Sequence, residues 1–201
     1  MSSVNNASRR RFRLRRFSRA REGAVAVEFA FLALPFLFML FSVLELALVF
    51  LLSASLDTAM EDAARQIRTG GFQNANGTRT EEEQKVEFRN RVCGGMLWLS
   101  TGCQSALHID VKSWDETDET TWSEANVAPD PYAPATDPAT GKVTIRFTTL
   151  FNAGGPKDIV LVRGYFRWVL LTPFLSQALS SAEGGVTIVQ STQTFRNEPY
   201  S

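Results

Sequence analysis

The hydrophobic positions of this chain change their spacing near residue 52, and this change divides one long predicted helix into two parts. Residues 24–52 read AVAVEFAFLALPFLFMLFSVLELALVFLL, and their only charged side chains are Glu28 and Glu45. A bilayer core about 30 Å thick requires roughly 20 apolar helical residues, so this segment predicts a transmembrane helix. A soluble amphipathic helix would show polar residues at every third or fourth position, whereas residues 29–41 contain none.

After the apolar run, hydrophobic residues recur at spacings of three and four, with charged residues between them. They are Leu56, Ala59, Met60, Ala63 and Ile67. This stripe predicts an amphipathic extension of the same helix over residues 53–70, ended by Gly70 and Gly71. Pro35 lacks an amide hydrogen, and we expect it to kink the helix within the bilayer.

Charge is divided unevenly along the chain, although the 21 basic and 21 acidic residues cancel in total. Residues 1–23 hold eight arginines and one acid, so the remaining residues carry a net charge of −7. Because positive charge collects on the cytoplasmic side of a span, the sequence predicts a cytoplasmic leader, 1–23, and an extracytoplasmic domain, 71–201.

Strand patterns follow in that domain, after a short predicted helix over residues 81–91. Apolar residues alternate in residues 107–111 and 143–147, and two longer apolar runs cover 159–171 and 186–195. Four strands after one long helix predict an α+β fold, in which the amphipathic part of the helix packs on a small antiparallel four-stranded sheet. The prolines at positions 129, 131, 134 and 138 predict a turn-rich connector, not a domain boundary.

Cys93 and Cys103 are the only cysteines, and both are predicted to lie outside the cytoplasm. In an oxidising compartment a disulfide between them is the default expectation. His108, the only histidine, begins a predicted strand, so it gives no zinc-like spacing with them, and no metal site or other cofactor is expected. The acidic stretch 115–119 lacks the glycine and the terminal glutamate of an EF-hand loop, and is interpreted as a solvated loop.

No pattern of residues indicates catalysis or nucleic-acid binding. The sequence contains no G-x-S-x-G, no H-E-x-x-H and no phosphate-binding glycine loop, so we expect no enzymatic activity. Aromatic and basic residues do alternate in one strand, as Arg163, Tyr165, Phe166, Arg167 and Trp168. In an acidic extracytoplasmic domain such aromatic residues are more typical of a sheet core than of a nucleic-acid platform.

The start of the apolar run holds residues suited to processing and to subunit packing. Gly23 would let an extended backbone enter a protease cleft, and cleavage there would make Ala24 the new N-terminus. Glu28 would then be the fifth residue, able to pair with the α-amino group of a neighbouring subunit, or else to reach the headgroups by snorkelling. Glu45 is interpreted as lying at the outer interface, the alternative being a lipid-buried carboxylate paired with another subunit.

The combination of a basic leader, Gly23, the segment Val27-Glu28-Phe29-Ala30, Pro35 and Glu45 resembles the TadE-like family of minor pseudopilins from tight-adherence (Flp) pilus systems. The C-terminal residues also resemble that family's closing motif, and are candidates for partner binding: Arg196, Asn197, Glu198, Pro199 and Tyr200. The resemblance implies cleavage between Gly23 and Ala24 by a prepilin peptidase, and packing through Glu28, Phe29, Pro35 and Glu45.

The resemblance also implies a place in the cell and a set of partners. The place is the bacterial inner membrane, which the chain would cross once. The partners are the lipid bilayer, the peptidase, other pilins and the pilus assembly machinery. Incorporation into an adhesive pilus is left open. The alternative is an uncleaved bitopic membrane protein whose outer domain binds an envelope partner. Cleavage of the leader distinguishes the two interpretations.

Overall fold

The computed structural model describes residues 21–74, 80–96, 99–115, 132–136, 143–147, 150–179 and 185–200. The chain forms two compact units, Met1–Leu44 and Glu45–Ser201.

One helix, α2 (Arg21–Arg68), contains both parts of the predicted helix and continues through Pro35. Its first part, up to Leu44, supplies all the described residues of the first unit. Its second part begins the second unit at Glu45 and ends just before Gly70, which has a φ of +73°. This conformation suits glycine, so the predicted glycine stop is confirmed.

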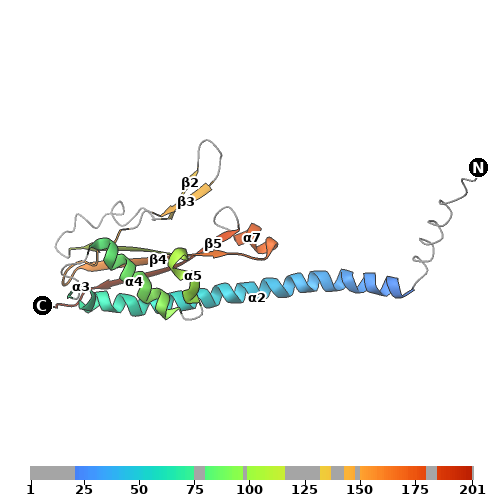
Figure 1. Ribbon diagram of the computed structural model, residues 1–201, viewed down its shortest axis with the longest axis horizontal. Helices are drawn as coiled ribbons and strands as arrows, with labels where there is room; N and C mark the ends of the chain where they lie inside the picture. Colours follow the sequence, from blue (N-terminus) through green and yellow to red (C-terminus); the bar gives the residue numbers. More distant parts are fainter. Residues whose placement is uncertain are drawn as a thin grey trace, which may run out of the picture. The chain divides into compact units, whose positions relative to one another are not determined.

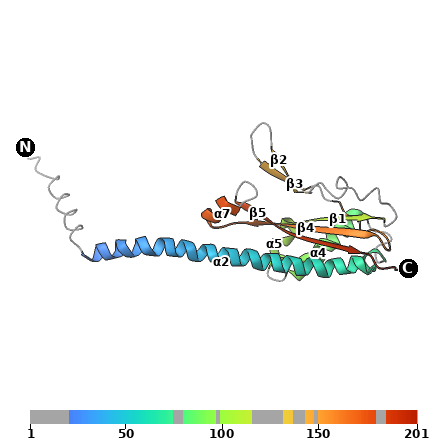
Figure 2. The same ribbon diagram turned by 180° about the vertical axis from the view of Figure 1, so that it is seen from behind.

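The second unit contains a three-stranded antiparallel sheet in the order β1-β4-β5. Its strands are β1 (Leu107–Trp114), β4 (Ile159–Val169) and β5 (Val186–Arg196), and each corresponds to a predicted strand. Figures 1 and 2 show these strands lying along the second part of α2. The α+β class is therefore confirmed, but the expected fourth strand is not in this sheet.

The predicted strand at 143–147 does form, but it pairs elsewhere. It is β3 (Val143–Phe147), which makes a separate two-stranded sheet with β2 (Tyr132–Thr136). Pro134 lies within β2 opposite Ile145, so this part of the proline-rich connector is a strand. A two-stranded sheet has only edge strands, where proline is tolerated. The other three prolines of the connector lie outside the described residues.

A physical reason for the shorter sheet lies at the outer edge of β1. The backbone N–H of Val111 donates to the Leu150 carbonyl at 2.9 Å, and the N–H of Asn152 donates to the Val111 carbonyl at 2.9 Å. Phe151 thus forms an isolated parallel bridge with Val111. Main-chain groups of residues 150–152 occupy the edge position at which a fourth strand would pair.

The core of the second unit lies between the sheet and two helices. The predicted stripe of α2 is buried in full, together with Leu52, so this prediction is confirmed. A Cβ atom on Gly164 of β4 would lie 2.9 Å from the Met60 sulfur, because α2 crosses the sheet closely at this point. Helix α4 (Glu81–Gly95) adds Phe88 and Val92 to the same core.

Helix α4 begins at a capping box. The Glu83 N–H donates to the Thr80 hydroxyl, and the Thr80 N–H donates to the Glu83 carboxylate at 2.8 Å. This arrangement satisfies exposed donors at the helix start, which explains why the predicted helix begins at residue 81.

Within the described ranges, three short helices connect the larger elements: α3 (Gly71–Asn74), α5 (Ser100–Ala106) and α7 (Pro173–Leu179). Cys93 of α4 and Cys103 of α5 face each other at disulfide distance, with their Cα atoms 5.7 Å apart. This geometry agrees with the pairing expected from the sequence. The acidic loop lies outside the described residues except for Asp115.

Candidate functional site

The first part of α2 presents large apolar side chains to its surroundings. Phe29, Phe31 and Leu32 are each at least 70% exposed, and most leucines and phenylalanines up to Leu44 are exposed as well. In the described part of the chain, α2 is the helix with the length and hydropathy needed to cross a membrane. Such a surface is unfavourable in water and favourable in lipid.

Except for Glu45, the residues predicted for processing and packing lie on this apolar part. Gly23, Ala24, Glu28, Phe29 and Pro35 are exposed in the chain described here. A Cβ atom at Gly23 would have no neighbour within 4 Å, so packing against the described residues does not account for this glycine. Their roles in cleavage and in subunit packing stay predictions.

Glu45 has a different environment, because its carboxylate is buried in the second unit. The residue is only 5% exposed. The backbone N–H of Thr172 donates to Oε2 at 2.8 Å, and the N–H of Leu171 donates to Oε1. These two donors lie at the turn that joins β4 to α7, so the carboxylate ties the helix to one end of the sheet. Charge-assisted bonds of this kind are among the strong ones.

Both interpretations drawn from the sequence left Glu45 without a partner in its own chain, and the structure supplies one. A role in subunit packing stays a prediction. The sequence could not reveal the contact, because Leu171 lies 126 positions further along the chain and donates through its backbone.

The C-terminal residues contact their own chain at the far end of α2. The Glu198 N–H donates to the Arg68 carbonyl at 2.8 Å, and their side chains form an ion pair at 3.6 Å. The Tyr200 ring packs over Gly70 so closely that a Cβ atom there would overlap it. The motif predicted as a partner-binding candidate thus holds the end of the helix.

Asn197 extends this arrangement into the turn before β4. It is buried, and its side-chain amide donates to the carbonyl oxygens of Ala153 and Gly155 at 3.0 and 2.8 Å. The Arg196 Nε donates to the Lys157 carbonyl at 3.1 Å. These contacts give the motif a structural role, while partner binding by it stays a prediction.

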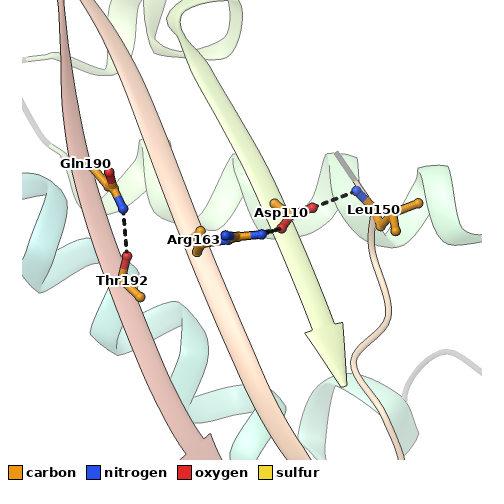
Figure 3. A network of polar contacts seen from close by, with 5 residues as sticks. All are labelled: Asp110, Leu150, Arg163, Gln190 and Thr192. Atoms are coloured by element: carbon orange, nitrogen blue, oxygen red, sulfur yellow. Dashed lines mark hydrogen bonds and ion pairs between the residues drawn. The ribbon is translucent and has the colours of Figure 1, made fainter. Parts of the chain in front are cut away.

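A buried ion pair lies on the face of the sheet opposite to α2. Figure 3 shows Arg163 of β4 pointing to Asp110 of β1, with the guanidinium Nη2 2.7 Å from the carboxylate Oδ2. The second carboxylate oxygen accepts the Leu150 N–H at 2.9 Å, so Asp110 also fixes the segment that occupies the edge of β1. Asp110 was not among the residues selected from the sequence. The only feature that could have indicated its role is that it is an isolated acidic residue in an apolar strand.

The aromatic residues of β4 are core residues, as expected. Tyr165 and Phe166 are buried, and Trp168 packs against the core. Arg163 is held by Asp110, which leaves Arg167 as the exposed cation of this strand.

His108 of β1 lies in a positively charged environment. Burial lowers its pKa from the ordinary value, and the positive charges of Arg167, Arg89 and Lys85 lower the pKa further. The neutral imidazole is therefore favoured at neutral pH. Across the described ranges, no three His, Cys, Asp or Glu side chains gather as a metal site would require.

A polar groove of about 280 Å³ runs between the second part of α2 and the outer half of β5. Its lining includes Glu61, Asp62, Arg65 and Arg68 from the helix, and Gln193, Thr194 and Phe195 from the strand. Exposed, mutually compensating charges of this kind are typical of a solvated surface.

The exposed apolar helix and the separate α+β unit define a class of protein: the chain fits a single-pass membrane protein with one small domain outside the lipid. The family model described as TadE-like protein matches residues 23–65. This match confirms the TadE-like resemblance over most of α2, while the C-terminal motif, Arg196–Tyr200, lies outside the matched residues. Comparisons with curated proteins and with solved structures gave no match. The family match and the helix together fit a membrane protein related to the tight-adherence pilus.

Proposed function

We propose that this chain is a minor pseudopilin of a tight-adherence (Flp-type) pilus system, made as a precursor and cleaved after Gly23 by a prepilin peptidase. The observation that carries the proposal is the coincidence of two boundaries. The TadE-like match begins at residue 23, and the apolar run, whose large side chains are exposed from Val25 onward, begins at Ala24 directly after it. The role is structural, in pilus assembly and adhesion, and requires no catalytic residue or cofactor.

The geometry of the helix supports this role through Glu28. Glu28 is exposed and would be the fifth residue of the mature chain. A carboxylate in a membrane segment costs roughly 2.5–3.5 kcal/mol at the helix centre on insertion scales, so a partner from another subunit is favoured. The α-amino group of Ala24 in a neighbouring pilin supplies the complementary charge. Phe29 and Pro35 lie on the same exposed segment and would contact the same neighbours.

The remaining assignments follow from the same proposal. The chain crosses the bacterial inner membrane once, with its arginine-rich leader in the cytoplasm and its α+β unit outside, because positive charge is retained on the cytoplasmic side. In that compartment Cys93 and Cys103, which lie at disulfide distance, would be oxidised.

N-terminal sequencing of the chain co-expressed with the cognate prepilin peptidase tests the processing step. We expect residues 1–23 to be absent from the mature protein, and a Gly23→Val change to retain them. Gly94→Ala is the matched control, because Gly94 likewise has open space around its Cα and lies outside the apolar segment. Retention of Met1 in the presence of active peptidase would favour the alternative function, an uncleaved bitopic protein that binds an envelope partner.

The packing role of Glu28 needs its own test. A Glu28→Leu change is expected to leave membrane insertion intact and to reduce co-purification with the other pilins of the system. Asp57→Asn, an exposed acid of the second unit, is the control. Unchanged co-purification and unchanged piliation for Glu28→Leu would show that the carboxylate is only a boundary charge.

A further inference from the structure

The turn that binds Glu45 carries an unusual apolar surface. Leu171 is 81% exposed, more than any other large hydrophobic residue in the described ranges, and Val169 and Leu179 are also exposed. We define these three residues as the apolar corner. A single exposed leucine needs no explanation. Here Val169 and Leu171 are exposed two positions apart where β4 ends, and Leu179 is exposed at the end of α7, the next element, which together indicate contact with an apolar phase or a partner.

The apolar corner is fixed at a known position along α2. Leu171 and its neighbour Thr172 donate their backbone N–H groups to Glu45, the residue that directly follows the apolar first unit. The 21 residues from Ala24 to Leu44 measure about 31 Å as a helix, the thickness of a bilayer core. If those residues span the hydrocarbon, Glu45 and the corner attached to it lie at the outer headgroup level.

Exposed apolar residues also continue on α2 just beyond Glu45. Leu48, Phe50 and Leu51 are exposed within the second unit. Residues 45–51 cover about 10 Å of helix, comparable to the headgroup region on one side of a bilayer. The helix therefore presents apolar side chains over the headgroup depth that begins at Glu45, the residue to which the turn of the corner is bound.

Charge complements this surface. Arg167 is exposed and precedes Val169 by two positions in β4, so the two side chains share one face of the strand. An arginine beside apolar residues can bind lipid phosphate while its neighbours enter the acyl boundary.

We propose that the apolar corner, with Arg167 beside it, is a lipid-binding surface that inserts into the headgroup region of the outer leaflet of the membrane that α2 spans. The domain would thus be held at the bilayer by two contacts, the helix and this turn. Binding at the second contact restricts the orientation of the domain on the membrane. This inference rests on the membrane-spanning role assigned to α2 under the proposed function.

The test uses the full chain in phosphatidylcholine/phosphatidylglycerol vesicles, with one added cysteine carrying an environment-sensitive fluorophore. The Cys93–Cys103 pair stays in place, because the described residues contain no free cysteine that would compete for the label. We expect a probe at Leu171→Cys to be quenched by lipids spin-labelled near the headgroup several-fold more than a probe at Leu150→Cys. Leu150 is the control, because it is also an exposed leucine, at 55% against 81% for Leu171. Its carbonyl accepts the Val111 N–H, and the strand partner of Val111, Val162, lies seven residues, about 23 Å, before Val169.

A third probe separates this inference from the proposed function. A label at Phe36→Cys, in the exposed apolar run, should be quenched by lipids spin-labelled deep in the acyl chain. Quenching at Phe36 without quenching at Leu171 overturns the lipid-binding surface and leaves the membrane span intact. Absence of quenching at Phe36 overturns the span itself. A Leu171 signal that shifts only at high protein-to-lipid ratio, and is insensitive to the lipid quencher, indicates another protein copy and also overturns the inference.

Discussion

The two parts of α2 are one continuous helix with opposite surroundings. Leu44 in the first part is 52% exposed, whereas Leu56 in the second part is completely buried. Both are leucines in the middle of a helical run, so helix propensity does not separate them. The difference comes from their neighbours: apolar residues surround the helix axis in the first part, whereas from residue 53 onward they form one stripe between charged residues.

This contrast shows how the pattern of apolar residues determines whether each part of the helix is buried in the domain or exposed to lipid. A stripe can be buried by one sheet and one further helix, as it is here by β4 and α4. A helix that is apolar on all sides cannot be covered by a domain of this size, and requires lipid or other helices. Glu45 marks the transition between the two parts, because the second unit begins at its buried carboxylate.

The largest expected effect comes from truncating a leucine in the second part. Leu56→Ala should lower the free energy of unfolding by about 2–5 kcal/mol, because it leaves a cavity in a packed core. Leu44→Ala, the matched change in the first part, should leave the stability of the domain unchanged. Denaturant unfolding of the detergent-solubilised full chain, followed by near-UV circular dichroism, measures both. Equal losses for the two variants would contradict the assignment of the two parts to different solvents.

The second comparison uses the two glutamates of the apolar run. Glu45→Ala should cost about 1–3 kcal/mol, because the N–H groups of Leu171 and Thr172 lose their acceptor. Glu28→Ala should have no effect on unfolding of the domain, since Glu28 is exposed in the first unit. The same unfolding measurement applies. A Glu45 variant as stable as the parent would show that water replaces the carboxylate, and that Glu45 does not hold the β4–α7 turn.

The far end of the second part offers a comparison between adjacent glycines. Gly70→Ala should cost about 1–3 kcal/mol, because alanine is strained at a φ of +73° and its Cβ atom would overlap the Tyr200 ring. Gly71→Ala should be nearly neutral, since the nearest atoms to its Cβ would be 3.8 Å away. Thermal unfolding of both variants in the Tyr200→Ala background separates the cost of backbone strain at residue 70 from the cost of steric overlap with the Tyr200 ring. If overlap contributes, Gly70→Ala costs less in that background.

The sequence predicted the elements more completely than their partners. The stripe of α2 and the three strands of the main sheet each follow from a periodicity that local residues display. The placement of β3 was wrong, because strand pairing depends on what occupies the edge of β1, and residues 150–152 occupy it through backbone atoms. Alternation in Val143–Phe147 indicates a strand but does not identify the strand beside it.

The same reasoning explains what could be predicted of the candidate site. The exposed apolar segment and its glycine are local features, and both were visible in the sequence. The contact of Glu45 with the β4–α7 turn and that of Glu198 with Arg68 join residues more than a hundred positions apart, mostly through backbone groups. Backbone donors and acceptors carry no residue-specific signal, so only the folded chain reveals these contacts.

The smallest expected effect concerns pH, and it distinguishes the second unit from the first because His108 is the only histidine in the chain. The pKa of His108 is lowered in the folded chain, by burial and then by the charges of Arg167, Arg89 and Lys85. The unfolded chain therefore takes up a proton at a higher pH than the folded chain does. His108 therefore stabilises the folded chain above the pKa of histidine in the unfolded chain, near 6.5. This stabilisation is lost as the pH falls from that value towards the lower pKa of the folded chain. We expect the unfolding midpoint to decline between about pH 7 and pH 5, and His108→Gln to remove that part of the decline. An identical pH profile for His108→Gln would show that the carboxylates alone account for it.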